Sequence, residues 1–359
     1  MVLDITPFLI GQLQKHPSAQ PRDMVKQCYQ AAFGAEHLLL DIDAAKAYFD
    51  TEFSSVPIPE IDVPICEAIS NDFSRVNLGA WKSADLPCGW LFSMFRHTAT
   101  SGAAANAHAA FQLHLQHAEQ LAASGQTPFS LADWRAYIAD YDSNNPRPVH
   151  HSAAYREAER PAYRVVAMRL ARLIPLLQRM HASANHSGEN ATVIAIDGQA
   201  ASGKTTAATA LANITGAGLI HMDDFFPPME LRTPERLAQP GGNVDYERFR
   251  DEALPHIAHP QAFSYPVFDC GEMRINGTRE VAASRFRIVE GAYSCHPELG
   301  NYMHIRVFSG ITPDEQMARI RKRNGDEMAA MFASRWIPME ESYFTAFSIA
   351  ERADWRLFS

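Results

Sequence analysis

The segment 192–213 constrains what this chain can fold into more than any other feature. A short apolar run at 192–196 leads directly into a loop with glycines at 198 and 203, followed by Lys-Thr-Thr at 204–206 and a run of helix-forming residues. This is the pattern G-x-x-x-x-G-K-[ST] in a strand–loop–helix context, which indicates a phosphate-binding loop. Backbone N–H groups turned into such a loop, together with the N-terminal end of the following helix, form a site for anions.

We therefore expect this loop to hold the phosphates of ATP or GTP. Lys204 is predicted to contact the β- and γ-phosphates, and the Thr205 hydroxyl is predicted to ligate Mg²⁺. The sequence does not distinguish ATP from GTP. The predicted nucleotide-binding residues are Gly198, Gln199, Ala200, Ala201, Ser202, Gly203, Lys204, Thr205 and Thr206.

Two classes of P-loop protein are disfavoured by what the chain lacks. A GTPase would need a guanine-specifying N/T-K-x-D element, and a motor ATPase would need a long hydrophobic strand ending in Asp-Glu; neither occurs. A second short strand instead delivers Asp223 and Asp224, followed by Phe225 and Phe226. Ligands bind at the C-terminal ends of parallel strands, where a carboxylate can accept the proton of an attacking hydroxyl.

From residue 191 to its end, the chain resembles the uridine kinase and phosphoribulokinase family of P-loop kinases. The resemblance covers about the last 170 residues and six elements in the family's order. These are the loop that ends at 206, the sequence Asp-Asp-Phe-Phe at 223–226, the segments 243–249 and 265–274, the Glu-Gly pair at 290–291, and a helix that follows Thr312. The resemblance implies transfer of a phosphoryl group from ATP·Mg²⁺ to a hydroxyl group.

The resemblance also implies roles for individual residues. Asp223 corresponds to the catalytic base, and Asp245 to an aspartate that binds sugar hydroxyls. Glu290 corresponds to an acid near the metal, and the helix after Thr312 to a lid whose arginines clamp the transferred group. We predict Lys204, Asp223, Arg319 and Arg323 as catalytic residues, and Thr205 and Glu290 as metal ligands. The predicted substrate-binding residues are Asp224, Phe226, Asp245, Tyr246, Phe268 and Arg274.

The acceptor pocket departs from the family's pattern. The family's His-Pro after the sugar-binding aspartate is replaced by Tyr246-Glu247, and the segment 227–242 is an insert. The sequence therefore predicts a small polar acceptor, nucleoside-like or sugar-like, without giving its identity.

Composition limits the partners and the compartment. The 359 residues carry a net charge of −9, which disfavours a general nucleic-acid-binding surface. The five cysteines are dispersed without a C-x-x-C pair, as expected for reduced thiols. The first residues lack the pattern of a signal peptide, and no apolar run approaches the roughly 18 residues that span a bilayer. We expect a cytoplasmic protein that binds neither nucleic acid nor membrane; a homo-oligomer is not excluded.

The N-terminal half of the chain has a different sequence pattern. Helical periodicity at 24–40, 102–123 and 163–180 predicts a mainly α-helical domain over 1–185, and the small polar segment 182–190 is the predicted linker. From 186 to 359, short apolar runs alternate with helical stretches, which predicts a three-layer α/β P-loop domain with a parallel sheet.

The role of residues 1–185 is not given by the sequence. The segment 33–41 and the region around His150 and His151 are dense in functional side chains. A metal or phosphate site there is one interpretation, but adjacent residues point apart, so packing is favoured. His108, His114 and His117 lie on an Ala-rich stretch, for which a surface position is favoured over a metal site.

Three functions remain in order of preference. The first is an ATP·Mg²⁺-dependent small-molecule kinase, and the second is a module in which nucleotide occupancy moves the N-terminal domain. The third is a structural ATPase. A switch needs neither a base candidate nor a basic lid, so the presence of Asp223 and of Arg319, Arg321 and Arg323 favours the enzyme.

Overall fold

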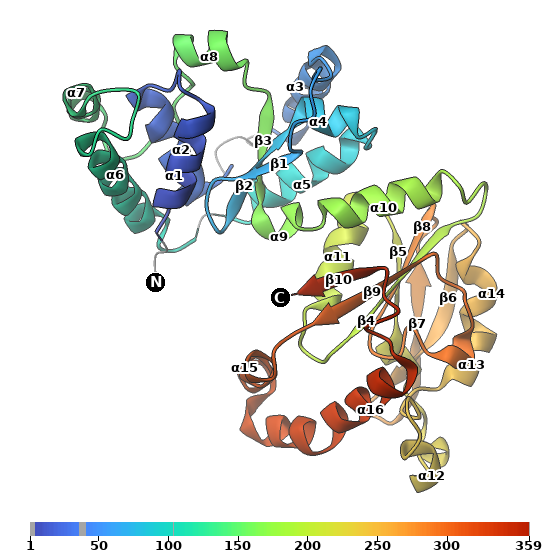
Figure 1. The fold of residues 1–359 in the computed structure, drawn as a ribbon. Helices are drawn as coiled ribbons and strands as arrows, with labels where there is room; N and C mark the ends of the chain where they lie inside the picture. The colour runs from blue at the N-terminus through green and yellow to red at the C-terminus, as the bar shows by residue number, and fades with distance from the viewer. Residues whose placement is uncertain (1–3, 36–40, 103, 359) are drawn as a thin grey trace. The chain divides into compact units, whose positions relative to one another are not determined.

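A computed structural model describes residues 4–35, 41–102 and 104–358 of the chain. These residues form two compact units, Met1–Ile174 and Pro175–Ser359, each described by itself here (Figure 1). The division follows Ile174, the first residue of helix α10 (Ile174–Ala184), whereas the sequence suggested a boundary at 185/186. Part of the segment 33–41 falls outside the described residues.

The N-terminal unit combines helices with a three-stranded antiparallel sheet in the order β1-β2-β3. The helical expectation over 163–180 is wrong at its start, because residues 163–167 form strand β3 and pair with β2. Val165 and Val166 are buried there, as suits β-branched residues in a pleated sheet. The elements are α1 (Thr6–Lys15), α2 (Pro21–Phe33), α3 (Ile42–Ser55), β1 (Cys66–Ala68), β2 (Phe73–Asn77), α4 (Leu78–Ser83), α5 (Cys88–Thr100), α6 (Ala107–Ala123), α7 (Leu131–Asp140), α8 (Ala153–Glu159), β3 (Tyr163–Ala167) and α9 (Met168–Ala171).

Helices α2 and α6 pack together in the core of this unit. His114 lies in that interface, is 3% exposed, and places its Nδ1 3.4 Å from the carbonyl oxygen of Cys28. The surface position favoured for His114 is therefore wrong. Its face of α6 also carries Phe111, Leu115 and Ala118, and this apolar stripe turns the imidazole inward.

The C-terminal unit is built on a five-stranded parallel sheet in the order β10-β9-β4-β8-β5, as predicted for an α/β domain. Every residue of the central strand β4 is buried, which is the pattern of a parallel strand covered on both faces. The strands are β4 (Thr192–Gly198), β5 (Gly218–His221), β8 (Phe286–Glu290), β9 (Ile305–Gly310) and β10 (Trp355–Phe358), and helix α11 (Lys204–Thr215) follows β4.

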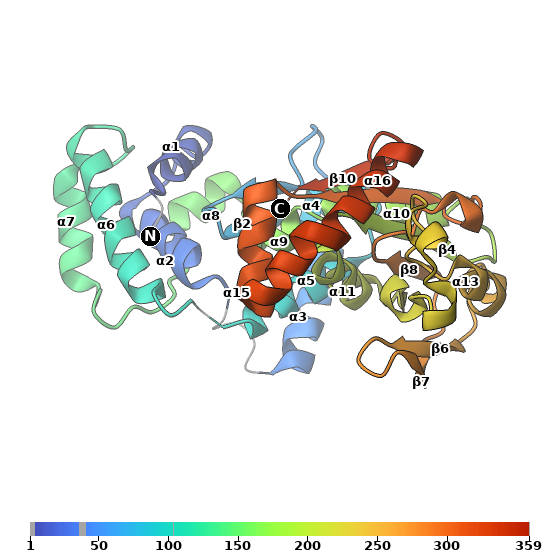
Figure 2. The same ribbon diagram turned by 90° about the horizontal axis from the view of Figure 1, so that it is seen from below.

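A second layer of structure lies beside strand β5. The antiparallel hairpin of β6 (Phe263–Asp269) and β7 (Arg274–Val281) contacts β5 and lies near α13 (Tyr246–Glu252) and α14 (Leu254–Ile257) (Figures 1 and 2). The short α12 (Pro234–Leu237) belongs to the insert 227–242. Phe225, Phe249 and Tyr265 join these elements to the core of the sheet through ring contacts.

The remaining helices follow strand β9. Helix α15 (Pro313–Met331) begins at a Thr312 N-cap and is broken at Gly325, whose φ of 81° only glycine adopts freely. Its two parts run in clearly different directions (Figure 1). A π-helical turn, Phe332–Trp336, connects it to α16 (Ile337–Phe347).

Two further expectations concern cysteines and membranes. All five cysteines are free thiols, as predicted. Within the described ranges, no helix combines the length and the apolar character needed to cross a bilayer.

Candidate active site

The loop between β4 and α11 is already shaped for phosphates. Gly198 and Gly203 have φ values of 136° and 97°. A Cβ on Gly198 would lie 2.1 Å from the backbone oxygen of Ser309, so only glycine fits this close approach. The Lys204 ammonium donates to the carbonyl oxygens of Gly198 (2.7 Å) and Gln199 (2.9 Å), which holds its charge over the loop. The predicted loop and its lysine thus lie together at the start of a helix.

A chain of polar contacts joins the end of the loop to the ends of strands β8 and β5. The Thr205 hydroxyl donates to Glu290 Oε2 (3.1 Å), and His221 Nδ1 donates to the other carboxylate oxygen (2.6 Å). Glu290 is 5% exposed, whereas Thr205 is exposed. The two predicted metal ligands are therefore brought together, and His221 is a third member that the sequence analysis did not name.

These residues fit the chemistry of Mg²⁺. A hydroxyl and a carboxylate are hard oxygen donors, and Mg²⁺ in nucleotide sites takes one or two protein ligands, with phosphate oxygens and water completing its shell. Among the described residues, no group of three or more His, Cys, Asp or Glu side chains is arranged to hold a metal ion. The arrangement thus suits a cation that arrives with nucleotide phosphates.

Asp223 and Asp224 follow β5 in a 3₁₀ turn, yet they have opposite surroundings. Asp223 is exposed and has no hydrogen bond or ion pair to any described residue. Crowding by protein atoms and the nearby charge of Glu290 raise the pKa of Asp223, while Lys204 lowers it. A free carboxylate with a raised pKa beside the phosphate loop has the properties of a general base.

Asp224 lies in the interior instead. Arg279 of β7 binds both carboxylate oxygens, with 3.0 Å from Nη2 to Oδ1, and the Tyr265 hydroxyl donates to Oδ2 (2.8 Å). The side chain is 6% exposed. The structure does not bring Asp224 to the open side of the site, because these partners occupy it and fix the hairpin to the end of β5.

Three other predicted substrate-binding residues lie around the same edge of the sheet. Phe226 is half-buried. Asp245 is 2% exposed and caps α13 by accepting from the Arg248 backbone N–H (3.0 Å), so at least one of its oxygens has a structural role. Tyr246 is half-buried and stacks on His296, with 5.1 Å between ring centroids.

The remaining two lie in the hairpin and differ from each other. Phe268 is 3% exposed, and the Arg232 guanidinium lies over its ring at 5.9 Å, so Phe268 forms a wall of the core. Arg274 is exposed and pairs with Glu272 at the tip of the hairpin (2.5 Å). Arg274 is therefore not placed among the site residues. On the same strand, Arg279 contacts Asp224, a contact that the sequence analysis did not predict.

The first arginine of the predicted lid contacts the phosphate loop. Arg319 Nη1 donates to the carbonyl oxygen of Ala201 (3.2 Å), and Nη2 pairs with Glu315 one turn earlier (2.6 Å). Arg323 lies one turn later, is exposed, and donates to Asn324 (2.7 Å). Arg321 points elsewhere and is exposed. Arg319 and Arg323 lie on one face of α15, and both precede the break at Gly325.

This placement predicts unequal effects of the lid arginines. Arg319→Ala should lower the rate of phosphoryl transfer about 10²-fold with a modest change in nucleotide affinity, since an arginine beside the loop acts on charge in the transition state. Arg323→Ala should have an effect in the same direction, and Arg321→Ala should be nearly neutral. Nucleotide affinity and product formation are measured for each variant. Equal and small effects would mean that the cluster is a solvated helix face.

Asp197, at the end of β4, was not identified from the sequence. It is fully buried and accepts hydrogen bonds from the backbone of Gly198 (2.7 Å), Tyr293 (3.2 Å) and Cys295 (2.9 Å) and from the Tyr343 hydroxyl (2.8 Å). Burial raises the pKa of Asp197 despite these donors. Asp197 thus joins the phosphate loop to the segment after β8 and to α16.

Glu340 of α16 is another residue that the sequence analysis missed. Its Oε2 accepts the backbone N–H of Ala200 in the phosphate loop (2.9 Å), while Glu341 accepts from the Gln199 side chain (2.8 Å). Crowding by the surrounding protein raises the pKa of Glu340 to about 7, although the Lys204 charge opposes this. The Glu340 carboxylate therefore binds one backbone N–H of the loop that is shaped for phosphates.

This contact predicts a pH-dependent nucleotide affinity. Above its raised pKa, Glu340 is charged and repels the triphosphate; as the pH falls through about 7 it takes up a proton and the repulsion is lost. From about pH 8 to about pH 6, wild-type affinity for ATP·Mg²⁺ should rise about tenfold more than that of Glu340→Gln. Calorimetry in buffers of different ionisation enthalpy should also show proton uptake on binding in the wild type alone. An unchanged pH profile in Glu340→Gln would contradict the idea.

Comparisons with known proteins concern only the C-terminal half. No protein-family model matches the chain, and no curated protein matches it. Among solved structures, one described as a possible uridine kinase from Bacillus stearothermophilus is 20% identical, covers 51% of this chain and 99% of its own, and has a TM-score of 0.36. A “putative fructose transport system kinase” from Silicibacter sp. TM1040 is 20% identical, with coverages of 49% and 98% and a TM-score of 0.39. The YGR205w protein is 16% identical, with coverages of 51% and 89% and a TM-score of 0.37.

TM-scores this low carry no argument about chemistry, so the site is interpreted from this chain's own residues. A parallel sheet, a glycine loop between its central strand and a helix, and a Thr205–Glu290 pair at the strand ends form one site. The C-terminal unit therefore has the α/β fold of P-loop nucleoside triphosphatases, and uridine-kinase-like and sugar-kinase-like proteins are among the structures that it resembles.

Proposed function

We propose that the C-terminal unit transfers the γ-phosphoryl group of ATP to a hydroxyl group of a small polar acceptor, nucleoside-like or sugar-like, with Mg²⁺ as cofactor. The observation that carries the proposal is the state of Asp223. This carboxylate is exposed at the end of β5 and free of protein partners among the described residues, whereas its neighbour Asp224 is fully engaged. A module that only binds nucleotide has no need of an unpaired carboxylate there.

The proposed step uses the residues in distinct roles. The acceptor hydroxyl oxygen forms a bond to the γ-phosphorus while its proton passes to Asp223, and the bond from phosphorus to the β–γ bridging oxygen breaks, releasing ADP. Lys204 and Arg319 place positive charge beside the transferred group. Thr205 and Glu290 would hold Mg²⁺, which neutralises phosphate charge when bound.

The acceptor class is part of the proposal. The aromatic and acidic side chains at the edge beyond β5, with Phe226 and Tyr246 half-buried, suit a flat or polyhydroxylated molecule. The insert 227–242 lies on the same side through Arg232, which stacks over Phe268. These groups support a small acceptor rather than a protein substrate.

The test is product formation across a panel of acceptors. The full chain is incubated with ATP·Mg²⁺ and nucleosides, free sugars or sugar acids, and ADP release is followed together with mass detection of the phosphorylated product. We expect release above the acceptor-free rate for one chemical class, with a matching product. Tight ATP binding without transfer to any member would argue against the kinase and for the nucleotide-gated module.

A further inference from the structure

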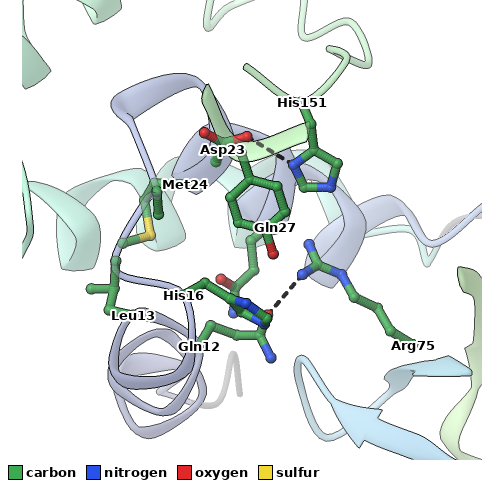
Figure 3. Close-up of a pocket in the computed structure, with 10 residues that line it drawn as sticks. Gln12, Leu13, His16, Asp23, Met24, Gln27, Arg75 and His151 are labelled. Atoms are coloured by element: carbon green, nitrogen blue, oxygen red, sulfur yellow. Dashed lines mark hydrogen bonds and ion pairs between the residues drawn. The ribbon is translucent and has the colours of Figure 1, made fainter. Parts of the chain in front are cut away.

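The N-terminal unit contains a small cavity lined by an unusual set of buried polar groups. Its volume is about 20 Å³, which is enough for about one water-sized group. Figure 3 shows Arg75 of β2 and His151 facing it from one side, and Gln12, His16 and Gln27 from the other. These side chains come from three separate parts of the sequence, so the fold has assembled them.

Arg75 is the central group of this cavity. It is 6% exposed, and its five N–H groups make three hydrogen bonds, all to neutral amide oxygens. Nε and Nη2 donate to Gln30 Oε1 (3.1 and 2.8 Å), and Nη1 donates to Gln12 Oε1 (2.7 Å). One N–H on each of Nη1 and Nη2 is left, and the Tyr163 ring covers one face of the guanidinium at 4.6 Å. A buried guanidinium whose donors are incompletely used is costly unless an anion joins it.

The carboxylates of the neighbourhood are bound to other groups. Among the described residues, none forms an ion pair with Arg75. Asp23 accepts from His151 (2.8 Å), from both donors of Ser152 (2.6 and 3.0 Å) and from the Gln20 backbone (3.0 Å). The bond from Gln20 caps α2, and together the four bonds leave Asp23 no free lone pair directed at Arg75.

The two nearby glutamates are also bound to groups other than Arg75. Glu67 is the cross-strand partner of Arg75 in the β1–β2 register, yet its carboxylate pairs with Lys15. Glu159 accepts from His16 (2.9 Å) and Ser18 (2.6 Å). The other nearby cation is half-buried Lys26, which donates to a backbone carbonyl and whose pKa burial lowers to about 8. Among the residues that line the cavity, Arg75 is the cation, and Asp23 is the one carboxylate, which is bound to groups other than Arg75.

His151 is a fixed wall and not a free base. Its Nδ1 donates to Asp23, its Nε2 accepts from the Tyr163 hydroxyl (2.7 Å), and its ring stacks on Tyr155 at 4.3 Å between centroids. Burial lowers the pKa of His151 to about 4, so the ring stays neutral in this arrangement. With both ring nitrogens engaged, recognition in the cavity depends on Arg75.

We propose that this cavity binds the carboxylate group of a small organic acid through Arg75. A carboxylate is planar and has two acceptor oxygens, which match the two unused N–H groups of a guanidinium in a bidentate pair. A volume of about 20 Å³ excludes a whole nucleotide, so only the carboxylate end of a ligand would enter the cavity. The site is separate from the phosphate loop and does not depend on the proposed kinase activity.

Hydrogen exchange on the full chain tests this site locally. Backbone exchange is followed by mass spectrometry in α1, α2 and the segment 149–155, with the phosphate loop at 198–206 monitored separately. The probes are formate, acetate and succinate at millimolar concentration, compared with chloride and inorganic phosphate at matched ionic strength. We expect the carboxylates to slow exchange around Arg75 and chloride to leave it unchanged. Protection by phosphate at least as strong as by the carboxylates would overturn the carboxylate assignment.

Variants show whether Arg75 and the cavity are responsible. Arg75→Gln should raise the carboxylate dissociation constant by about 10- to 100-fold, the usual effect of losing charge-assisted hydrogen bonds. Ala19→Met fills the cavity but keeps the charge of Arg75, and it should raise the carboxylate dissociation constant in the same way. This second variant keeps the proposal testable if Arg75→Gln does not fold. Arg22→Gln removes an exposed cation from the nearby helix α2 as a control and should bind like the wild type. Binding that survives both cavity variants, or no protection by any carboxylate in the wild type, would overturn the proposal.

Discussion

Asp223→Asn should lower phosphoryl transfer by about 10²–10⁴-fold while leaving ATP·Mg²⁺ affinity within a few-fold of wild type, because this is the usual contribution of a positioned general base. The substitution keeps the shape of a side chain that makes no hydrogen bond or ion pair with the described residues, so the fold should be unaffected. Transfer by the wild type should also fall at low pH. The pKa of Asp223 is raised, so protonation removes the base at a higher pH than for an ordinary aspartate.

Asp224→Asn is the matched control for this prediction. It makes the same chemical change one residue away, where the carboxylate is bound by Arg279 and Tyr265. We expect it to lower the melting temperature, because a buried pair loses one charge, without a selective loss of transfer per folded molecule. If Asp223→Asn instead abolishes nucleotide binding in proportion to transfer, Asp223 acts on the metal and not on the acceptor.

Lys204→Ala should reduce transfer by about 10²-fold or more, since the ammonium that the loop carbonyls of Gly198 and Gln199 hold in place would no longer stabilise charge on the phosphoryl group. Far-UV circular dichroism should be unchanged, because the lysine is half-buried at a helix start and packs against no core residue cluster. Turnover is measured under saturating ATP. A variant with turnover like that of the wild type would rule out the phosphate-loop assignment.

Sequence predicted those parts of the site that are encoded locally. The phosphate loop is a contiguous motif whose glycines have a steric reason, seen in the contact of Gly198 with the Ser309 backbone. The pairing of Thr205 with Glu290 could be expected because the ends of neighbouring parallel strands meet at one edge of a sheet. In the same way, the alternation of apolar runs and helical stretches predicted the α/β fold that the structure confirms.

The parts that could not be predicted depend on long-range packing. Glu340 reaches Ala200 across 140 residues of sequence, and Tyr343 reaches Asp197 across 146. No local sequence pattern marks Glu340 or Tyr343 for such a contact. The choice between Asp223 and Asp224 likewise depends on Arg279, which becomes a neighbour only through the β6–β7 register.

The N-terminal unit shows the same limit. The strand β3 was expected to be helical, because Tyr163, Val165 and Val166 gain their strand conformation from pairing with β2 and not from their own periodicity. His114 was expected at the surface, because an Ala-rich segment gives little contrast between the faces of a helix.

The central claim is transfer of the γ-phosphoryl group to a hydroxyl, and isotope tracing tests it most directly. The full chain is incubated with ATP that carries ¹⁸O on its γ-phosphoryl group, with Mg²⁺ and the acceptor panel, and all products are analysed by mass. The account predicts one acceptor that gains a phosphoryl group with its ¹⁸O retained, in amounts equal to the ADP formed, and formation of this product about 10²–10⁴-fold more slowly with Asp223→Asn. Labelled inorganic phosphate as the sole product, at the same rate with and without every acceptor, would contradict it.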